Sequence, residues 1–406
     1  MAAARRTRER LVVIGAGMAG LKLVEAITEL SPGRYDITLI GQEPRPAYNR
    51  VLLSGVLAGD VAETDIELRP AAWYAERGIE LLAGIACSTL HPAEREVAFA
   101  TGARVAYDQL VLATGSAALR LPVPGHDLPG VLTFRDVADV KAMRAAEPGT
   151  PAVVIGGGLL GVEAAYGLAK RGCKVTLLHL MPRLMERQLD ARAAALLRAA
   201  IENKGIDVVL EAQTAAIEGS GRAERVRLED GRAYPAMLVV MAAGVRPATA
   251  LALTGGLAIG RGIEVDDTLQ TSRPGIYAIG ECAEHRGQCC GLVEPAHEQA
   301  QALARHLAGL PARYEGSVTA ASLKVSGVPV FSMGDFEGEG AEAILLEDAQ
   351  AATYRKLVIR EDRLAGAVLF GDTGDALWYR DLIRQQAPVA PIRSWLAFGK
   401  AYAEAA

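Results

Sequence analysis

The stretch Leu11-Val12-Val13-Ile14-Gly15-Ala16-Gly17-Met18-Ala19-Gly20 decides the fold, because four apolar residues run directly into a Gly-x-Gly-x-x-Gly motif. This pattern predicts a buried strand that turns into a helix. Gly15 allows the tight turn, Gly17 lets the backbone approach a pyrophosphate, and Gly20 lets the helix pack closely on its strand. Backbone N–H groups at the helix start then face the phosphates. Taken alone, the motif also fits a glycine turn in an ordinary α/β domain.

A second copy of the pattern lies further along the chain. Val153-Val154-Ile155 runs into Gly156-Gly157-Gly158-Leu159-Leu160-Gly161, which is followed by Val162 and Glu163. Two copies in one chain predict two dinucleotide-binding sites. We therefore expect an α/β protein with two Rossmann-like domains.

Composition excludes several other kinds of protein. A chain of 406 residues predicts two or three domains of about 100 to 200 residues each. The net charge of -5 and the dispersed lysines and arginines give no electrostatic footprint for nucleic acid or an anionic membrane. No apolar run reaches the length of about 18 residues expected of a membrane helix, and residues 1–10 lack the apolar core of a secretory signal.

The five cysteines lack the spacing of a zinc site or of a disulfide framework. This pattern predicts no metal site and a reducing, cytoplasmic setting.

The region after the first motif completes a β-α-β unit, with a helix expected over 19–30 and a strand over 35–40. Glu43 stands close to the place of the acid that accepts hydrogen bonds from a ribose, about 20 residues beyond the last glycine. It is either that ribose ligand or a surface carboxylate. Arg50, in a polar loop, either contacts a phosphate or a flavin or is a surface arginine.

Three further buried strands end in small residues. The strand at 110–112 runs into Ala113-Thr114-Gly115, and the strand at 238–242 ends at Ala243-Gly244. Small residues let the chain pass close to a bound cofactor. A third strand, at 276–279, ends at Gly280-Glu281, where polyol hydroxyls can donate to the carboxylate.

The second unit makes no clear choice between NADH and NADPH. Its helix is expected over 161–170 and its second strand over 174–178. An acid after that strand repels the 2′-phosphate of NADP and a base attracts it, but the chain has His179 there, with Arg183 and Arg187 downstream. His179 is either a ligand contact or a surface imidazole whose hydrogen bonds are satisfied.

Residues 121–130 are rich in proline and glycine, and we expect the chain to cross between domains there. The last part, 319–406, has strands expected over 354–360 and 364–370 and a helix over 376–385. It reads as a small α+β domain without a cofactor motif.

With both glycine motifs, Ala113-Thr114-Gly115 and Gly280-Glu281, the chain resembles a family of flavoprotein reductases with two dinucleotide domains, over nearly its whole length. This pyridine nucleotide-disulfide-oxidoreductase-like family includes rubredoxin and ferredoxin reductases. Within it, the chain is most similar to the FAD- and NADH-binding part of the large subunit of assimilatory nitrite reductase. Residues 48–54, 179–190 and 280–287 carry that likeness.

The resemblance implies glutathione-reductase-type domains: a split FAD-binding domain at 10–120 and 245–318, an NAD(P)H-binding domain at 121–244, and an interface domain at 319–406. It implies that Glu43 binds the adenosine ribose, Cys87 the adenine through its backbone, and Glu281 the ribityl chain. Arg50 and the helix start near Glu294 would flank the isoalloxazine, and Glu163 would meet the nicotinamide carboxamide. The predicted cofactor-binding residues are Gly15, Gly17, Met18, Ala19, Gly20, Glu43, Arg50, Cys87, Ala113, Thr114, Gly115, Gly280, Glu281, Glu294, Gly156, Gly158, Leu159, Leu160, Gly161, Glu163, His179, Arg183, Ala243 and Gly244.

Two departures from the family pattern bear on the partner. Oxygenase-type reductases of the family usually have a lysine after Ser54, where this chain has Gly55, which weakens an oxygenase-partner interpretation. The chain also ends where nitrite reductase would continue into its iron–sulfur and siroheme regions. We therefore expect that it does not reduce nitrite itself.

The resemblance thus predicts hydride transfer from NADH, or from NADPH, to FAD, with the two rings stacked at the domain junction. The cofactors carry the bond chemistry, so no catalytic side chain is expected. Electrons then pass to a separate iron–sulfur, rubredoxin-type or nitrite or nitrate reductase component, and a homodimer is left open. Two alternatives remain: a slow, NADH-sensing interaction protein, and an oxidase or disulfide reductase, for which Cys289-Cys290 or Cys282 would be the candidate thiols.

Overall fold

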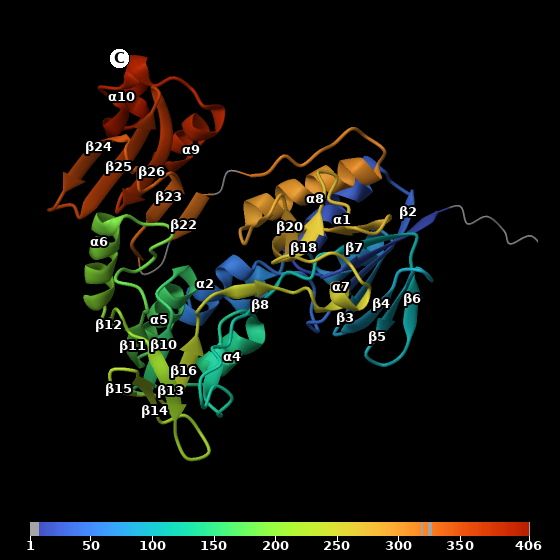
Figure 1. Ribbon diagram of the computed structural model, residues 1–406, viewed down its shortest axis with the longest axis horizontal. Helices are drawn as coiled ribbons and strands as arrows, with labels where there is room; N and C mark the ends of the chain where they lie inside the picture. Colours follow the sequence, from blue (N-terminus) through green and yellow to red (C-terminus); the bar gives the residue numbers. More distant parts are fainter. Residues whose placement is uncertain (1–7, 318–319, 324–326, 406) are drawn as a thin grey trace, which may run out of the picture. The chain divides into compact units, whose positions relative to one another are not determined.

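The computed structural model describes residues 8–317, 320–323 and 327–405. Internal contacts divide this part of the chain into two compact units, which are described separately below (Figure 1). The first contains the described residues up to Leu52 together with Ala62–Ala117 and Val245–Ser317. The second contains Leu53–Val61, Ala118–Gly244 and the described residues beyond 319. The chain therefore leaves the first unit three times.

The first unit is built on a five-stranded parallel sheet of order β19-β7-β1-β2-β3. In β1 the last four residues are all buried, as expected for a parallel strand covered on both faces. The first glycine motif follows this central strand directly, so its loop lies at the carboxyl edge of the sheet. The strands are β1 (Glu9–Ile14), β2 (Tyr35–Gly41), β3 (Ile79–Ala83), β7 (Gln109–Leu112) and β19 (Ile276–Ala278).

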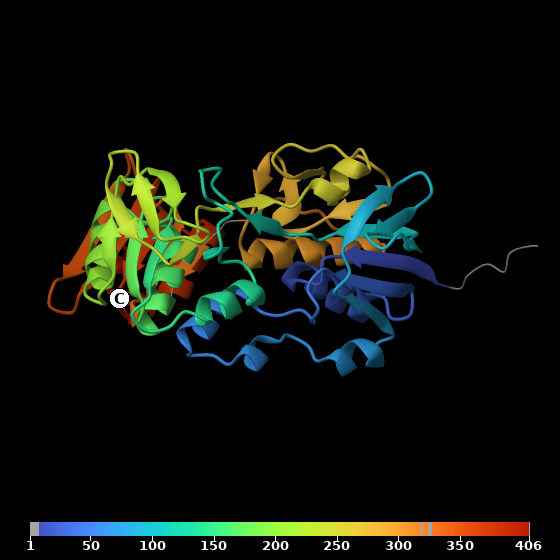
Figure 2. The same cartoon turned by 90° about the horizontal axis from the view of Figure 1, so that it is seen from below.

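Helices α1 (Met18–Leu30) and α8 (Val293–Leu307) share one apolar core on this sheet. Leu21, Val24 and Ile27 recur at helical spacing on the buried face of α1 and pack in the same cluster as residues of α8. Figure 2 shows α8, in orange, beside blue amino-terminal elements. Segments almost 300 residues apart in sequence thus complete one domain core.

Smaller elements complete the first unit. Strands β4, β5 and β6 form an antiparallel meander, and β18, β20 and β21 form a second small sheet. Their bounds are β4 (Cys87–His91), β5 (Glu96–Phe99), β6 (Arg104–Ala106), β18 (Ile263–Val265), β20 (Ala283–His285) and β21 (Gln288–Cys289). The unit also contains α3 (Ala71–Glu76) and α7 (Ala250–Thr254). Strand β17 (Val245–Pro247) pairs with β8 (Ser116–Ala118), whose last residue already belongs to the second unit.

The second unit repeats the architecture with a parallel sheet of order β12-β11-β10-β16-β9. One difference is where the strand beside β16 comes from, because β9 precedes the glycine motif in the chain whereas its counterpart β19 follows it. The strands are β9 (Val131–Thr133), β10 (Pro151–Ile155), β11 (Lys174–Leu178), β12 (Asp207–Val209) and β16 (Leu238–Met241).

Helix α5 (Leu159–Lys170) follows the second glycine motif and packs against α2 (Leu53–Ala58). At Gly167 a Cβ would lie 2.7 Å from Leu57, so the two helices approach closely there. The remaining elements of this part are α4 (Val137–Arg144), α6 (Ala191–Glu202) and an antiparallel sheet of β13 (Thr214–Glu218), β14 (Arg225–Leu228) and β15 (Ala233–Pro235).

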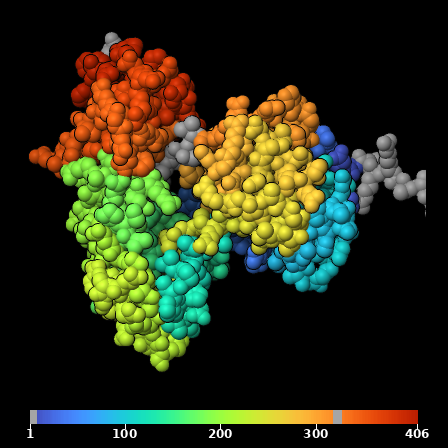
Figure 3. Space-filling view, in the orientation of Figure 1, coloured from blue at the N-terminus to red at the C-terminus, as the bar shows by residue number. Residues whose placement is uncertain are grey.

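The carboxy-terminal part of the second unit is an antiparallel sheet of order β22-β23-β26-β25-β24. Leu357 and Leu369 from the sheet pack with Tyr379 and Ile383 of α9. In Figure 3 this orange and red part lies against the green segment that contains α6, and ion pairs between them are described below. The elements are β22 (Ala320–Leu323), β23 (Val330–Gly334), β24 (Glu342–Asp348), β25 (Thr353–Arg360), β26 (Arg363–Phe370), α9 (Ala376–Gln385) and α10 (Lys400–Ala405).

The predicted fold class is confirmed: two Rossmann-like sheets and a small α+β part are present. In the described part of the chain, every helix falls short of the length and apolar character needed to cross a bilayer.

Candidate cofactor sites

The first glycine loop is closed by backbone contacts that leave no room for side chains. Gly15 has φ +119°, and a Cβ there would lie 2.0 Å from the carbonyl oxygen of Ala113. At Gly20 a Cβ would lie 2.0 Å from the carbonyl oxygen of Gly15, which explains the close packing of α1 on β1. The loop therefore needs glycine at both positions for the fold itself.

Gly17 differs from these two glycines. Apart from its chain neighbours, no described atom lies within 4 Å of a Cβ built there, and its backbone is extended. It is the N-cap of α1, which in the described residues has neither a side-chain cap nor an acidic residue in its first turn. The N–H groups of Met18 and Ala19 thus begin a helix whose positive end is open to an anion, and this geometry fits a pyrophosphate.

Two predicted segments lie against this loop. The Ala113 N–H donates to Ile14 O at 2.7 Å, and Thr114 is held by a hydrogen bond from its hydroxyl to Ala248 O. Gly115 adopts φ +68°, so the turn after β7 also requires glycine. The structure therefore brings Ala113 and Thr114 to the first glycine loop.

Gly280, two residues after β19, lies against the first turn of α1, and Glu281 follows it in the chain. A Cβ at Gly280 would lie 3.0 Å from that of Ala19, and the Gly280 N–H donates to the side chain of Gln299 at 2.7 Å. The Ser116 hydroxyl donates to Glu281 Oε2 at 2.6 Å. The sequence interpretation missed both Ser116 and Gln299. Gln299 had a signal, because it is a polar residue on the apolar face of α8.

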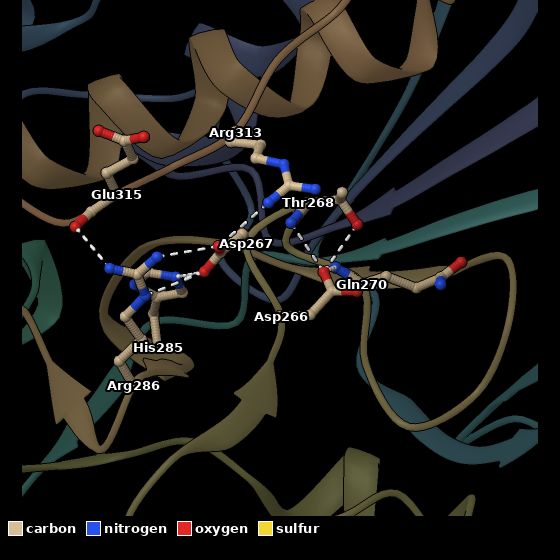
Figure 4. A network of polar contacts seen from close by, with 8 residues as sticks. All are labelled: Asp266, Asp267, Thr268, Gln270, His285, Arg286, Arg313 and Glu315. Atoms are coloured by element: carbon tan, nitrogen blue, oxygen red, sulfur yellow. Dashed lines mark hydrogen bonds and ion pairs between the residues drawn. The ribbon is translucent and has the colours of Figure 1, made fainter.

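The segment that follows Glu281 is anchored by Asp267 (Figure 4). Its carboxylate accepts from His285 Nε2 at 2.9 Å and from Arg286 Nη2 at 2.9 Å. Arg286 also donates to the carbonyl oxygen of Glu315. The hydrogen bonds from Arg286 and His285 lower the pKa of Asp267 to about 2. The carboxylate thus stays ionised and ties three separate loops of the unit together.

Glu43 and Arg50 are brought together as an ion pair. Glu43 also accepts from the Tyr48 hydroxyl at 2.7 Å, and the Arg50 guanidinium lies 5.2 Å from the centre of the Tyr48 ring. The carboxylate is therefore held in position just after β2. Glu294, also predicted as a site residue, lies in the first turn of α8.

Five thiols remain unpaired among the described residues, and all have poor nucleophilic character. Burial raises the pKa of Cys87 to about 11 and raises that of each of the others. Cys282 is fully buried, and its Sγ donates to Leu112 O and Ile279 O. Because the thiolate is the reactive form, this environment disfavours thiol chemistry. The described His, Cys, Asp and Glu side chains include no group of three or more suited to a metal ion.

The second glycine loop repeats the construction of the first. Gly156 has φ +121°, and a Cβ there would lie 2.3 Å from Ala242 O, while one at Gly161 would lie 1.7 Å from Gly156 O. Gly158, the N-cap of α5, has no described atom within 4 Å of a Cβ apart from its chain neighbours. Leu159 and Leu160 begin the helix, and Ala243-Gly244 follows the neighbouring strand β16. This loop also fits a pyrophosphate.

Glu163 is buried in α5, with only 9% of its surface exposed. Burial raises its pKa to about 7, and a hydrogen bond with the Ser54 side chain opposes that shift. Ser54, on α2, was missed as a partner because it lies more than 100 residues earlier in the sequence.

His179 and Arg183 both contact Glu186, and they differ in their second partner. The Gly157 N–H donates to His179 Nδ1 at 2.9 Å, and the imidazole is buried. Its Nε2 lies 3.0 Å from Glu186 Oε2. Arg183 donates from Nη2 to the Glu186 carbonyl oxygen at 3.5 Å and forms an ion pair with Glu337, after β23. The hydrogen bonds of His179 are thus made to protein groups, but the expectation of a surface imidazole is wrong because the ring is buried beneath the glycine loop and its own loop.

Comparisons with known proteins agree with this geometry. Residues 9–302 match the family model described as pyridine nucleotide-disulphide oxidoreductase, and residues 320–387 match the rubredoxin NAD+ reductase C-terminal domain. The nitrite reductase [NAD(P)H] of Bacillus subtilis (strain 168) is 46% identical over 94% of this chain and 48% of its own length. The chain thus spans about half the length of that relative.

A second relative matches over most of both chains. It is the ferredoxin–NAD(+) reductase component of the biphenyl dioxygenase system of Paraburkholderia xenovorans (strain LB400), 37% identical over 84% of this chain and 85% of its own. The solved putidaredoxin reductase–putidaredoxin complex aligns with a TM-score of 0.85 and 26% identity over 94% of both chains. The chain therefore belongs to the pyridine nucleotide-disulphide oxidoreductase family.

Proposed function

We propose that this protein oxidises NADH through bound FAD and passes the electrons to a separate redox protein. The observation that carries the proposal is the pair of glycine loops, at Gly17 and Gly158, each open in front of an uncapped helix start. When bound, the two cofactors supply hydride transfer and the onward release of electrons. The protein's residues bind and orient them.

Particular residues have separate roles in this proposal. Gly15, Gly17 and Gly20 with the N–H groups of Met18 and Ala19 hold the FAD pyrophosphate, and Glu281 accepts from the ribityl chain while Ser116 fixes its orientation. Gly156, Gly158 and Gly161 hold the nicotinamide dinucleotide, with Glu163 at its carboxamide. Glu43 binds the adenosine ribose, and Arg50, the backbone at Cys87 and the helix start near Glu294 complete the flavin site.

The proposed domains are 10–120 with 245–318 for FAD, 121–244 for NAD(P)H, and 319–406 as an interface. The acceptor that we propose is an iron–sulfur or rubredoxin-type protein, or a nitrite or nitrate reductase component. Support comes from the relatives, which include a ferredoxin–NAD(+) reductase, and from the match to a rubredoxin reductase C-terminal domain. The five free thiols fit a reducing, cytoplasmic setting. A homodimer stays a prediction.

Anaerobic stopped-flow reduction tests the proposal. Purified protein is mixed with NADH and, separately, with NADPH, and the bleached protein is then mixed with oxidised ferredoxin or rubredoxin. Rapid bleaching followed by rapid reoxidation supports the reductase. Bleaching without discharge by any small redox protein would favour the NADH-sensing alternative, and a purified protein without flavin would contradict the proposal.

A further inference from the structure

The loop after β11, residues 179–190, is bound to the second glycine loop through both backbone polar groups of Gly157. Gly157 donates its N–H to His179 Nδ1 and accepts from the Met185 N–H, each at 2.9 Å. A Cβ at Gly157 would lie 2.6 Å from both His179 and Leu184, so the two segments are in close contact with no room for a side chain at Gly157. In Rossmann sites the residue that reads the adenosine ribose lies at the end of this second strand. The 179–190 loop is therefore positioned to read it.

The 179–190 loop supplies a carboxylate, that of Glu186, near the end of β11, although His179 occupies the usual position of the acid in the sequence. His179 is turned inward to the glycine loop, and Glu186 Oε2 lies 3.0 Å from its outer nitrogen. The Glu186 side chain is 24% exposed, whereas that of His179 is 8% exposed. Glu186 thus presents the negative charge that the end of β11 itself lacks.

Arg183 lies beside Glu186, where its Nη2 donates to the Glu186 carbonyl oxygen at 3.5 Å, and its charge is neutralised by the carboxy-terminal sheet. Arg183 pairs with Glu337, which lies between β23 and β24. Lys356 reinforces this connection, because its Nζ donates to the carbonyl oxygen of Glu337 at 3.0 Å. Arg187 is 86% exposed and 3.9 Å from Glu186, so solvent screens its charge.

We propose that Glu186 and the Arg183–Glu337 ion pair make the second site selective for NADH over NADPH. Glu186 accepts a hydrogen bond from the ribose 2′-hydroxyl and repels a 2′-phosphate. Glu337 neutralises the arginine that would otherwise attract that phosphate. The inference rests on the proposed function, because it assumes that the second glycine loop binds a nicotinamide dinucleotide.

Calorimetric titration of the FAD-loaded protein tests the selectivity without turnover. The two ligands are adenosine 5′-monophosphate and adenosine 2′,5′-bisphosphate, which differ only in the 2′-phosphate. We expect wild type to prefer the monophosphate. Glu186→Gln and Glu337→Gln should each shift the ratio of dissociation constants toward the bisphosphate by roughly tenfold, as expected for one charge-assisted contact.

Two controls separate selectivity from general loosening. Glu347→Gln removes the Arg192–Glu347 ion pair, which joins α6 to the same sheet away from the glycine loop, and should leave the ratio unchanged. Arg183→Gln added to Glu337→Gln should return the ratio to that of wild type. The same shifts should appear in kcat/KM for NADPH relative to NADH.

The outcomes separate a failure of the proposed selectivity from a failure of the proposed dinucleotide site. If the monophosphate binds but neither glutamate variant alters the ratio, the selectivity inference is wrong while the dinucleotide site stands. If wild type binds neither ligand and NADH does not reduce its flavin, the proposed function itself is contradicted.

Discussion

Gly15 and Gly17 lie two residues apart, yet alanine is expected to impair folding at Gly15 and cofactor binding at Gly17. Gly17→Ala places a methyl group in open space on extended backbone, so the chain folds but the pyrophosphate loses its place. We expect normal far-UV circular dichroism and FAD binding weakened roughly 10- to 100-fold, from an overpacking cost of about 1–3 kcal/mol. Gly15→Ala meets Ala113 O and a positive φ, and should lower the yield of folded protein. A Gly17→Ala protein that retains full flavin would contradict the pyrophosphate assignment.

Glu163 should make stability depend on pH. Its pKa in the folded state is about 7, above the value of 4.5 for an exposed glutamate, so the folded state holds more protons between these values. The free energy of unfolding therefore falls as pH rises through this window, by up to about 3 kcal/mol. Glu163→Gln should remove the fall, which urea titrations at pH 5 and pH 8 would measure. Glu147→Gln, an exposed carboxylate in the same unit, should behave as wild type; an equal slope in the Glu163→Gln protein would show that burial does not hold the proton there.

Some residue roles could be predicted from the sequence and others could not. The glycines were predictable, because backbone angle and close approach act within the motif itself. His179 was left with two outcomes, because the partner of its outer nitrogen lies seven residues away in a loop without regular structure. Glu337 was beyond prediction, since it meets Arg183 across 154 residues of chain. The roles of the predicted cofactor residues stay predictions until ligand binding is measured.

At the scale of elements, Asp190 joins α6 to the carboxy-terminal sheet. Its Oδ1 caps α6 by accepting from the Ala193 N–H at 3.0 Å, and its Oδ2 accepts from the Tyr354 hydroxyl at 2.7 Å. Lys356 Nζ lies 3.3 Å from the same carboxylate, which is almost fully buried. One side chain thus satisfies a helix end, a hydroxyl and an ammonium.

Replacing Asp190 should therefore destabilise both the start of α6 and the contact of α6 with the carboxy-terminal sheet. Asp190→Ala loses the cap, leaves the Tyr354 hydroxyl without its carboxylate and removes the ion pair of Lys356, which keeps its hydrogen bond to Glu337. We expect a loss of about 3 kcal/mol in the free energy of unfolding. Asp190→Asn keeps the cap and should lose less. Thermal unfolding measures the difference, and hydrogen exchange in the first turn of α6 should rise most in Asp190→Ala. Equal exchange in the two variants would argue against the capping role.

Strand and helix positions were largely confirmed, because continuous apolar runs mark the parallel strands and glycine or proline marks their ends. The helix over 376–385 and the strands over 354–360 and 364–370 agree with α9, β25 and β26 within one residue. Hydrophobic periodicity could not predict which helices pack against each other. The packing of α2 against α5 depends on Leu57 fitting over Gly167, a match of shape between distant segments.

At the scale of the whole molecule, the two units carry separate glycine loops and separate cores. Each ligand should therefore stabilise its own unit. We expect two calorimetric transitions, with FAD raising the midpoint of one and NAD+ that of the other. A ligand at 100 times its dissociation constant contributes about 2.7 kcal/mol. A single transition that both ligands raise together would contradict independent units.

The repeated departures of the chain from the first unit have a consequence for its synthesis. The second sheet is complete once Met241 has been made, because all five of its strands come from residues 131–241. The first sheet begins with Glu9 but lacks β19 until the chain has reached Ala278, and its core lacks α8 until the chain has reached Leu307. On the ribosome, the parallel sheet that starts first is therefore the later of the two to be completed, and a nascent chain has its second glycine loop on a finished sheet before its first.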